Sequence, residues 1–595
     1  MLKRTDTSDP SYYHKVVDCQ YACPAHTPVP EYIRLIAFGR YTEAYLVNRA
    51  SNVFPGILGR ICDRPCEPAC RRGRVAEQPV AICRLKRAAA DFKDASYREH
   101  LPKIPTQKNG KKVALVGAGP ASLTVVNDLM PLGYTCVLYD KKQIAGGAVA
   151  QQVPEFRLPR EVLQEECQNI IDMGVENRLG TEVTSLQKLL DEGYDAVFLG
   201  SGAPIGRDLT LPGRQENAAY IQIGLDFLAN VNFGHLKKIS GHVLVIGGGN
   251  TAMDCCRTAL RLGASKVSVF APEGFDEMLA SPWEKEDALK EGVHVVNNYL
   301  PQEFVAGANG LSGVRFQHLS SCYTAKKEFR PIPSGQPDLV LDCQMVVLAV
   351  GQEVQFSYAE PGLLALREGG RGIAVDRLTH QTSHPKVFAG GDAAFGASNM
   401  ITSVAHGHAA AISIHLFCQG KDVAKDREKP SMTLRSQKMT LNQWAYVNDF
   451  SDTHRHHVPE HDLAERLNHL EAEVELGFDI GLALKETKRC LNCDVQTVFK
   501  EKACIECDAC VDICPSMCLN IIEEPESEVA LRAGLKIPAE NLATDLFVAT
   551  VPQTKKLMVK DENICIHCGL CAERCPTDAW DMKVFSLHLP KAGNL

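Results

Sequence analysis

Cysteine is the residue type whose spacing in this 595-residue chain points most directly to chemistry. The run Cys-x2-Cys-x2-Cys-x3-Cys-Pro occurs twice near the C-terminus, starting at Cys504 and again at Cys565. Three such thiolates can hold one face of a [4Fe–4S] cube, while the fourth cysteine crosses to the neighbouring cube. A zinc site would need only four thiolates and no paired Cys-Pro ending. The expected ligand sets are Cys504, Cys507, Cys510 and Cys575 for one cube, and Cys565, Cys568, Cys571 and Cys514 for the other.

A second cysteine-rich stretch lies before residue 84, and a separate Cys-x2-Cys pair stands in RCLNC (489–493). Thiols clustered in this way are seldom disulfides in a reducing compartment, so they indicate metal or redox chemistry. With the C-terminal runs they make sixteen thiols, enough for four cubes. The other eight of the 24 cysteines, Cys518 among them, are expected to need no special role. The additional candidate ligands are Cys19, Cys23, Cys62, Cys66, Cys70, Cys83, Cys490 and Cys493.

Residues 112–140 carry the pattern of a dinucleotide-binding turn. The stretch KVALVGAGPASLTVVNDLMPLGYTCVLYD predicts a strand, a glycine turn, a helix and a second strand. Gly117 allows the tight turn, and Gly119 lets the backbone approach a pyrophosphate at the helix N-terminus. Asp140 ends the second strand, where a carboxylate can accept hydrogen bonds from ribose hydroxyls. The turn residues expected to border the pyrophosphate are Gly117, Gly119, Pro120, Ala121 and Ser122.

A second turn of the same plan follows in GHVLVIGGGNTAMDCC (241–256), so the chain is expected to hold two nucleotides. The strand after it ends at Glu273 rather than at arginines, and a 2′-phosphate needs a fixed cation. NAD(H) is therefore favoured over NADP(H), although Arg257 or Arg261 could supply that cation. The expected contacts of this second site are Gly247, Gly249, Asn250, Thr251 and Glu273.

Two further stretches, GGAVAQQVPEFRLP (146–159) and VFAGGDAAFGASNM (387–400), carry a family resemblance. With GGGNTAMD they resemble the small subunit of glutamate synthase and the matching part of dihydropyrimidine dehydrogenase, over residues 15–420. The resemblance implies FAD at the first turn, with Asp392 on the ribityl chain or phosphate. It also implies a helix, starting near Ser398, that points at the flavin ring. The usual Arg-Arg pair after the second turn is missing here. Further flavin contacts implied by the resemblance are Gly146, Gly147, Arg157, Gly391 and Asn399.

The N-terminal stretch GRICDRPCEPAC (59–70) resembles the helical iron–sulfur domain of the same family, which carries two [4Fe–4S] clusters. That domain begins RCxxC and continues with CxxxCP, but here only CQYACP (19–24) is present at the start. The resemblance implies that RCLNC is the displaced first half. The alternative is one N-terminal cluster, with Cys490 and Cys493 as a small zinc site or free thiols. Relatives often use a Gln as one ligand; Lys86 falls near its place, and Cys83 could replace it. The implied sets are Cys19, Cys70, Cys490 and Cys493 for one cube, and Cys23, Cys62, Cys66 and Cys83 for the other.

The elements needed to position these groups define a multidomain α/β protein. It is expected to combine a helical iron–sulfur domain, Rossmann-like FAD and NAD(P) domains, and a C-terminal α+β domain like bacterial ferredoxin. The His-bearing THRHH (453–457) is interpreted as part of a solvated connector rather than a metal site. The expected boundaries are 1–105 for the helical domain, 106–235 with 351–420 for the FAD domain, 236–350 for the NAD(P) domain, 421–500 for a linker whose helix carries RCLNC, and 501–595 for the ferredoxin-like domain.

Composition excludes several other classes of protein. A net charge of −8 and the lack of a Lys/Arg-dense block argue against nucleic acid as a partner. The sequence contains no run of eighteen apolar residues, so no membrane span is predicted. The first residues lack the apolar core of a signal peptide. A cytoplasmic location is therefore expected. A thiol reductase is disfavoured because Cys255 and Cys256 are adjacent and no Cys-x2-Cys dithiol lies in the nicotinamide domain.

The favoured function is an oxidoreductase that passes electrons between NAD(P)H, FAD and a chain of [4Fe–4S] clusters, to or from ferredoxin or a partner subunit. Hydride transfer depends on ring stacking more than on an acid or base, so no catalytic residue is named. The alternative is an electron-wiring subunit without turnover of its own, in a complex such as a 2-oxoacid:acceptor oxidoreductase, a hydrogenase or a formate dehydrogenase. Both hypotheses predict a hetero-oligomer.

Overall fold

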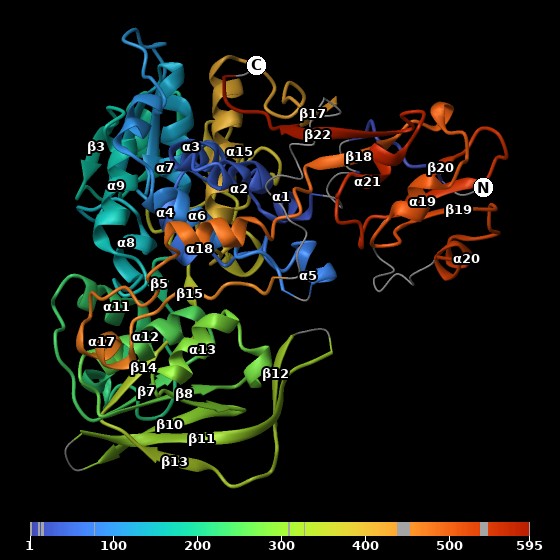
Figure 1. The fold of residues 1–595 in the computed structure, drawn as a ribbon. Helices are drawn as coiled ribbons and strands as arrows, with labels where there is room; N and C mark the ends of the chain where they lie inside the picture. The colour runs from blue at the N-terminus through green and yellow to red at the C-terminus, as the bar shows by residue number, and fades with distance from the viewer. Residues whose placement is uncertain are drawn as a thin grey trace. The chain divides into compact units, whose positions relative to one another are not determined.

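The computed structural model describes residues 3–9, 12, 17–76, 78–307, 310–325, 328–436, 453–535 and 546–593 (Figure 1). The chain forms two compact units. We call the first the cysteine-rich unit; it comprises Met1–Lys103, Asp426–Pro459 and Gly477–Leu595. We call the second the Rossmann unit; it comprises Ile104–Lys425 and Glu460–Leu476.

The first sheet of the Rossmann unit is parallel throughout, in the order β16-β4-β1-β2-β3. Its central strands are continuous apolar runs because helices cover both faces of a parallel sheet. The helix α15 packs along α7 so closely that a Cβ at Gly407 would lie 2.5 Å from the Ala121 carbonyl oxygen. The strands are β1 (Lys112–Val116), β2 (Thr135–Asp140), β3 (Glu176–Leu179), β4 (Ala196–Leu199) and β16 (Val387–Ala389), and the helices are α7 (Pro120–Leu129), α8 (Ala148–Gln152), α9 (Arg160–Ile171), α10 (Leu186–Asp191) and α15 (Met400–Cys418).

The second sheet of this unit is also parallel, in the order β6-β14-β7-β8-β9, and is overlaid by the antiparallel strands β10 to β13. Phe270 of β8 stacks on Phe316 of β11 with ring centroids 4.1 Å apart, which joins the two layers. The parallel strands are β6 (Ile221–Ile223), β7 (His242–Ile246), β8 (Lys266–Ala271), β9 (His294–Asn297) and β14 (Met345–Leu348). The antiparallel strands are β10 (Tyr299–Gly307), β11 (Gly310–Tyr323), β12 (Phe329–Pro333) and β13 (Leu339–Asp342). The helices are α11 (Gly224–Asn232), α12 (Asn250–Arg261), α13 (Pro282–Lys290) and α17 (Leu463–Asn468).

The N-terminal part of the cysteine-rich unit is helical, with its core around Tyr32, Ile33 and Leu85. The helix α18 (Ile480–Thr487), which precedes RCLNC, joins this core by packing on α2 and α6. It begins at Asp479, whose carboxylate accepts a hydrogen bond from the Leu482 N–H, as a good N-cap does. The other helices are α1 (Asp18–Ala22), α2 (Val29–Ala37), α3 (Tyr41–Asn52), α4 (Pro55–Ile61), α5 (Arg72–Val75) and α6 (Ile82–Asp91).

The C-terminal part of this unit contains two small antiparallel sheets and a pair of short helices packed against each other. The strand that follows RCLNC is β18, and it pairs with β22, so one segment belongs to both parts of the unit. The strands are β17 (Ser431–Ser436), β18 (Val495–Phe499), β19 (Leu519–Ile522), β20 (Leu546–Thr550), β21 (Leu557–Asp561) and β22 (Trp580–His588), and the helices are α19 (Ala509–Ile513) and α21 (Leu570–Arg574). The multidomain α/β plan expected from the sequence is confirmed.

The helix α15 is long and apolar enough to cross a membrane by length and composition alone, and within the described ranges it is the one helix that passes this test. However, 61% of its apolar window is buried inside the protein. Its packing on α7 is that of a core helix of the Rossmann unit.

Candidate cofactor and metal sites

A cavity of about 500 Å³ lies in the Rossmann unit at the carboxyl ends of β1, β4 and β16. This is where parallel sheets bind nucleotides. The helix α7 starts at the cavity with no side chain capping it, so its first backbone N–H groups can receive an anion. The predicted residues that line the cavity are Gly117, Gly119, Pro120, Ala121, Asp140, Gly147, Gly391 and Asp392.

Two glycines make this cavity possible. Gly117 has a φ of +97°, and a Cβ there would lie 2.5 Å from the Gly200 carbonyl oxygen. Gly147 has a φ of +59°, and its Cβ would lie 2.8 Å from the Cα of Gly119. Any side chain at either position would therefore push apart the segments that form the cradle.

Two carboxylates, Asp140 and Asp392, line the cavity in different surroundings. Asp140 accepts hydrogen bonds from the Ala118 and Lys142 N–H groups, both at 2.8 Å, so its position is fixed. Burial raises the pKa of Asp392 to about 7, although a hydrogen bond from the Ser398 N–H at 3.1 Å opposes the shift. A buried acid with a single backbone donor can still accept hydrogen bonds from a polyhydroxyl ligand.

Four of the predicted flavin contacts do not line this cavity. Ser122 is fully buried behind the turn, beside Gly200, and Gly146 lies against Leu163. Asn399 caps α15 through a hydrogen bond from the Thr402 N–H at 3.0 Å. The fourth is Arg157.

Arg157 belongs to an ion-pair network that the sequence did not reveal. Its guanidinium lies 2.8 Å from both carboxylate oxygens of Asp254 and 2.6 Å from Glu284. Burial raises the pKa of Asp254 to about 6 against the attraction of Arg157. The network ties the segment before α9 to α12, the helix of the second glycine turn. The available signal was a charged residue, Asp254, on an otherwise apolar stretch of α12.

The second glycine turn also begins a helix, since Gly249 precedes α12 and a Cβ there would meet open space. Gly247 has a φ of +141°, and Asn250 accepts a hydrogen bond from the Ser281 N–H at 2.8 Å. Glu273 is buried over the turn: Tyr323 donates to its Oε1 at 3.1 Å, while its buried Oε2 has no hydrogen-bond partner. An orphaned carboxylate oxygen beside a nucleotide turn fits a ribose hydroxyl as donor.

The two arginines that could have supplied a cation for a 2′-phosphate are already paired. Arg257 is buried and donates to Glu291 at 2.9 Å and to Glu284 at 3.1 Å. Arg261 donates to the same Glu291 at 2.6 Å. Both guanidinium groups are already engaged with buried carboxylates, so neither can bind a 2′-phosphate without giving up an ion pair.

The C-terminal thiols gather into two groups. Cys504, Cys507, Cys510 and Cys575 line one small cavity together with Phe499 and Trp580. In the other group, burial and then the neighbouring thiols Cys565 and Cys514 raise the pKa of Cys568 to about 11. Burial and the neighbouring Cys565 also raise the pKa of Cys571. Each group brings four free thiols together, which is the donor set of an iron–sulfur cube.

The RCLNC segment meets the N-terminal cysteines. Cys19, Cys70, Cys490 and Cys493 line one small cavity, although they come from opposite ends of the chain. Burial, followed by the proximity of Cys70, Cys493 and Cys490, raises the pKa of Cys19 well above its usual value. The four thiols thus form a donor set that fits one cube.

Arg489 anchors this segment on the N-terminal helices. Its buried guanidinium donates to the carbonyl oxygens of Gln78 at 2.7 Å and Pro79 at 2.8 Å, and to Glu486 at 3.0 Å. Glu486 also accepts a hydrogen bond from the Ala81 N–H at 2.8 Å and pairs with His456 at 2.7 Å. Part of the THRHH stretch is therefore packed against the core rather than solvated.

The remaining N-terminal thiols form a fourth group. The neighbouring thiols Cys62 and then Cys66 lower the pKa of Cys83 well below its usual value. Burial disfavours the charge on Lys86, but Cys83, Cys62, Cys66 and Cys23 outweigh it and raise the Lys86 pKa. Cys83 therefore lies among the thiols, while Lys86 offers them a buried positive charge.

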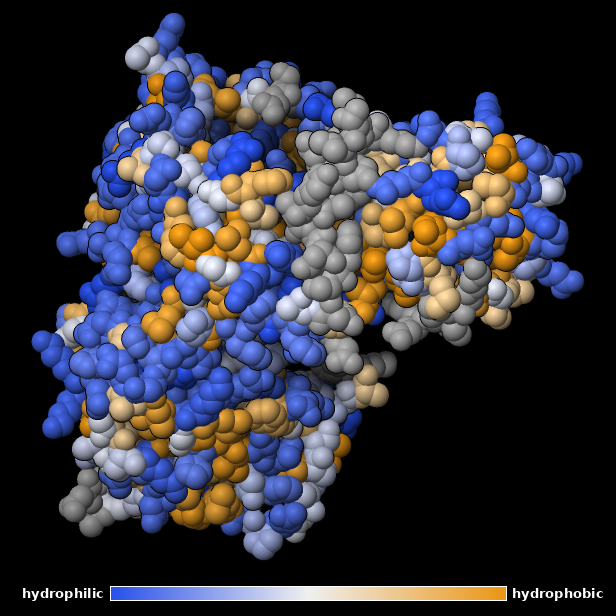
Figure 2. Space-filling view, viewed as in Figure 1, coloured by the Kyte–Doolittle hydropathy of each residue, from blue (hydrophilic) through white to orange (hydrophobic). Residues whose placement is uncertain are grey.

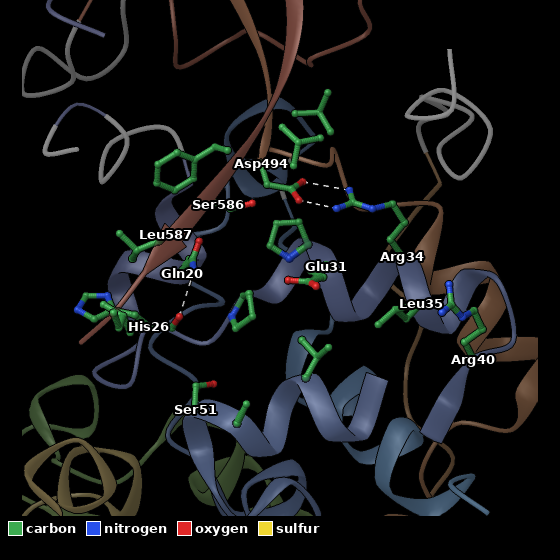
Figure 3. A pocket seen from close by; sticks show the side chains of 18 of the residues that line it. Gln20, His26, Glu31, Arg34, Leu35, Arg40, Ser51, Asp494, Ser586 and Leu587 are labelled. Atoms are coloured by element: carbon green, nitrogen blue, oxygen red, sulfur yellow. Dashed lines mark hydrogen bonds and ion pairs between the residues drawn. The ribbon is translucent and has the colours of Figure 1, made fainter. Parts of the chain in front are cut away.

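Another cavity of about 500 Å³ lies in the cysteine-rich unit between α2, α3 and β22 (Figure 3). Figure 3 shows the Arg34 guanidinium facing the carboxylate of Asp494, with one contact of 3.1 Å. Asp494 directly follows RCLNC, so this pair holds the segment from its other side. None of the predicted cofactor or metal residues lines this cavity.

One chain thus carries thiol groups suited to iron–sulfur cubes, a nucleotide cradle and a second glycine turn. This combination defines an iron–sulfur flavoprotein oxidoreductase. Comparison with known sequences agrees. The chain belongs to the pyridine nucleotide-disulphide oxidoreductase family, whose pattern matches residues 111–411. Residues 12–97 match dihydropyrimidine dehydrogenase domain II with its 4Fe-4S cluster, and residues 503–579 match a 4Fe-4S dicluster domain.

Individual relatives agree with the predicted resemblance. The chain is 34% identical to the NADP(+)-dependent formate dehydrogenase subunit beta of Moorella thermoacetica, over 80% of this chain and 70% of the relative. It is 31% identical to the glutamate synthase [NADPH] small chain of Azospirillum brasilense, over 68% and 86%. It is 32% identical to a Salmonella typhi homolog of the NAD-dependent dihydropyrimidine dehydrogenase subunit PreT, over 67% and 91%. The expected resemblance to glutamate synthase small subunits is confirmed.

Proposed function

We propose that this chain passes electrons between a nicotinamide nucleotide and a partner protein through FAD and four [4Fe–4S] clusters. Bound FAD supplies the step from paired to single electrons, which the clusters carry onward. The single observation that supports this proposal most is the convergence of Cys19, Cys70, Cys490 and Cys493 on one cavity. It completes one of the four thiol groups in a chain that also carries both nucleotide turns.

The cradle residues would hold FAD without chemical participation. The N-terminus of α7 would receive the pyrophosphate, because its backbone N–H groups are uncapped and Gly119 leaves space. Asp140 would bind the adenosine ribose and Asp392 the ribityl chain, since both line the cavity. Arg157 and Asp254 would not contact FAD themselves. Their ion pair would fix the second glycine turn relative to the cradle.

We further propose that NADH is preferred to NADPH. Support comes from Glu273, whose unpartnered Oε2 would accept from a free 2′-hydroxyl and repel a 2′-phosphate. The names of the relatives do not support either nucleotide over the other, because they include NADP(+), NADPH and NAD. Initial-rate assays with both nucleotides test it: equal kcat/KM values would remove the proposal.

The partner is proposed to be ferredoxin or another subunit of a hetero-oligomer. The relatives include proteins named as subunits or chains of larger enzymes. Cys507 is exposed, and Ile505, two residues before it, keeps 46% of its residue surface accessible. Figure 2 shows further apolar side chains on the ferredoxin-like part. The cube held by Cys504, Cys507, Cys510 and Cys575 is therefore the one proposed to exchange electrons with the partner, and a cytoplasmic location is part of this proposal.

The same relatives are also consistent with the alternative function, an electron-wiring subunit that has no turnover of its own. The two possibilities separate when the chain is purified alone, reconstituted anaerobically and assayed for NADH- or NADPH-driven reduction of ferredoxin or a viologen dye. Turnover supports an autonomous oxidoreductase. Absence of turnover despite full flavin and iron would leave only the electron-wiring role.

A further inference from the structure

The two Cys-Pro endings of the ferredoxin-like part are structural repeats of each other. In CPSMC (514–518) the Cys518 N–H donates to the Sγ of Cys514 at 3.3 Å. In CPTDA (575–579) the Ala579 N–H donates to the Sγ of Cys575 at 3.2 Å. Residues before both donors have positive φ angles, and a strand follows each ending. Cys518 and Ala579 therefore occupy equivalent positions.

The repeats differ in what this position carries. Ala579 offers a methyl group, whereas Cys518 adds a buried thiol whose Sγ lies 3.4 Å from the Sγ of Cys514. The Cys565 thiol is a second neighbour of this sulfur. Cys514 and Cys565 are both assigned to one cube, so a fifth thiol contacts two ligands of that cube and has no counterpart at the other.

The chemistry of the loaded site decides which sulfur donates. Ligand cysteines are thiolates and carry no proton, so the S–H of Cys518 is the donor and a ligand sulfur the acceptor. A hydrogen bond to a ligand sulfur stabilises the extra negative charge of the reduced cluster and raises its reduction potential.

We propose that Cys518 is a positioning residue whose thiol hydrogen bond makes the cube of Cys514, Cys565, Cys568 and Cys571 easier to reduce than its neighbour. The inference rests on the proposed ligand sets. This cube faces the N-terminal part of the unit: Arg71 lines the RCLNC cavity and bonds the ring of His567, which lies between Cys565 and Cys568, at 2.8 Å. Electrons arriving from the N-terminal clusters would thus meet the more easily reduced cube first.

The test uses three variants of the full holoprotein, each titrated potentiometrically with EPR detection. Cys518→Ala should lower the reduced-to-oxidised ratio of one ferredoxin-type cube about threefold at a fixed potential, which is about 28 mV for one electron. Cys518→Ser keeps a donor and should restore the ratio to the wild-type value or above. Ala579→Cys installs the thiol at the other repeat and should raise the ratio of the other cube.

Three results would overturn the inference. The first is an unchanged ratio in Cys518→Ala with full iron content. The second is a Ser variant that behaves like the Ala variant. The third is loss of iron in Cys518→Ala, because Cys518 would then be a ligand and not a donor. The proposed function is judged separately, since it requires nicotinamide-driven cluster reduction in every variant that keeps its iron.

Discussion

Replacing Cys490 and Cys493 with Ser should remove one cube and leave the other three. These residues supply two of the four thiols around the cavity of Cys19 and Cys70, and serine is close to cysteine in size. A cube needs four ligands, so iron and acid-labile sulfide should each fall from about sixteen to about twelve per chain. Colorimetric iron and sulfide assays on anaerobically purified protein measure both numbers.

A matched variant removes the same motif elsewhere. Cys504→Ser with Cys507→Ser also deletes a Cys-x2-Cys pair and should also lose about four irons, but from the ferredoxin-like part. The two variants should therefore lose different EPR signals. The reasoning is refuted if the Cys490 and Cys493 variant keeps about sixteen irons. It is equally refuted if that variant loses the signal that the matched variant loses, because RCLNC would then serve the ferredoxin-like part.

Four further outcomes are expected. Glu273→Gln should raise kcat/KM for NADPH about tenfold relative to NADH, because it removes a negative charge next to the 2′-phosphate; an unchanged ratio in initial-rate assays contradicts this. Gly147→Ala should release FAD, because the added Cβ has no room at a φ of +59°; full flavin absorbance after gel filtration would contradict the cradle. Arg489→Met should lower the first thermal transition, because Glu486 loses the Arg489 cation and the buried carbonyl oxygens of Gln78 and Pro79 lose their donor, at a cost of about 3 kcal/mol, whereas exposed Arg40→Ala should not. The pKa of Asp392 is raised from 3.8 to about 7 in the folded chain, so flavin-free protein should lose stability as pH rises from about 4 to about 7, and Asp392→Asn should flatten that loss in melting curves.

Short-range patterns were sufficient to predict much of this protein. The ligand runs starting at Cys504 and Cys565, and the turns at Gly117 and Gly247, are local devices whose spacing reflects local geometry. That is why the class of protein and its ferredoxin-like part could be expected from the sequence. The placement of RCLNC came from a resemblance, because no local rule brings residue 490 to residue 19.

The features that could not be predicted from the sequence depend on contacts between segments that are far apart in the chain. The strand β17 falls in the predicted 421–500 linker, yet it pairs with β22, and residues 460–476 belong to the Rossmann unit. The partners of Arg157 and Arg489 lie about a hundred and four hundred residues away. Cys518 resembled an ordinary buried cysteine until the structure placed its thiol beside two ligand sulfurs.

The central claim is that nicotinamide, flavin and clusters form one electron path in this chain. Anaerobic titration of the holoprotein with NADH, followed by flavin absorbance and EPR together, tests it most directly. Flavin bleaching should be accompanied by the EPR signal of a reduced [4Fe–4S] cluster. Flavin that bleaches fully while every cluster stays oxidised under excess NADH and NADPH, although dithionite reduces those clusters, would contradict it.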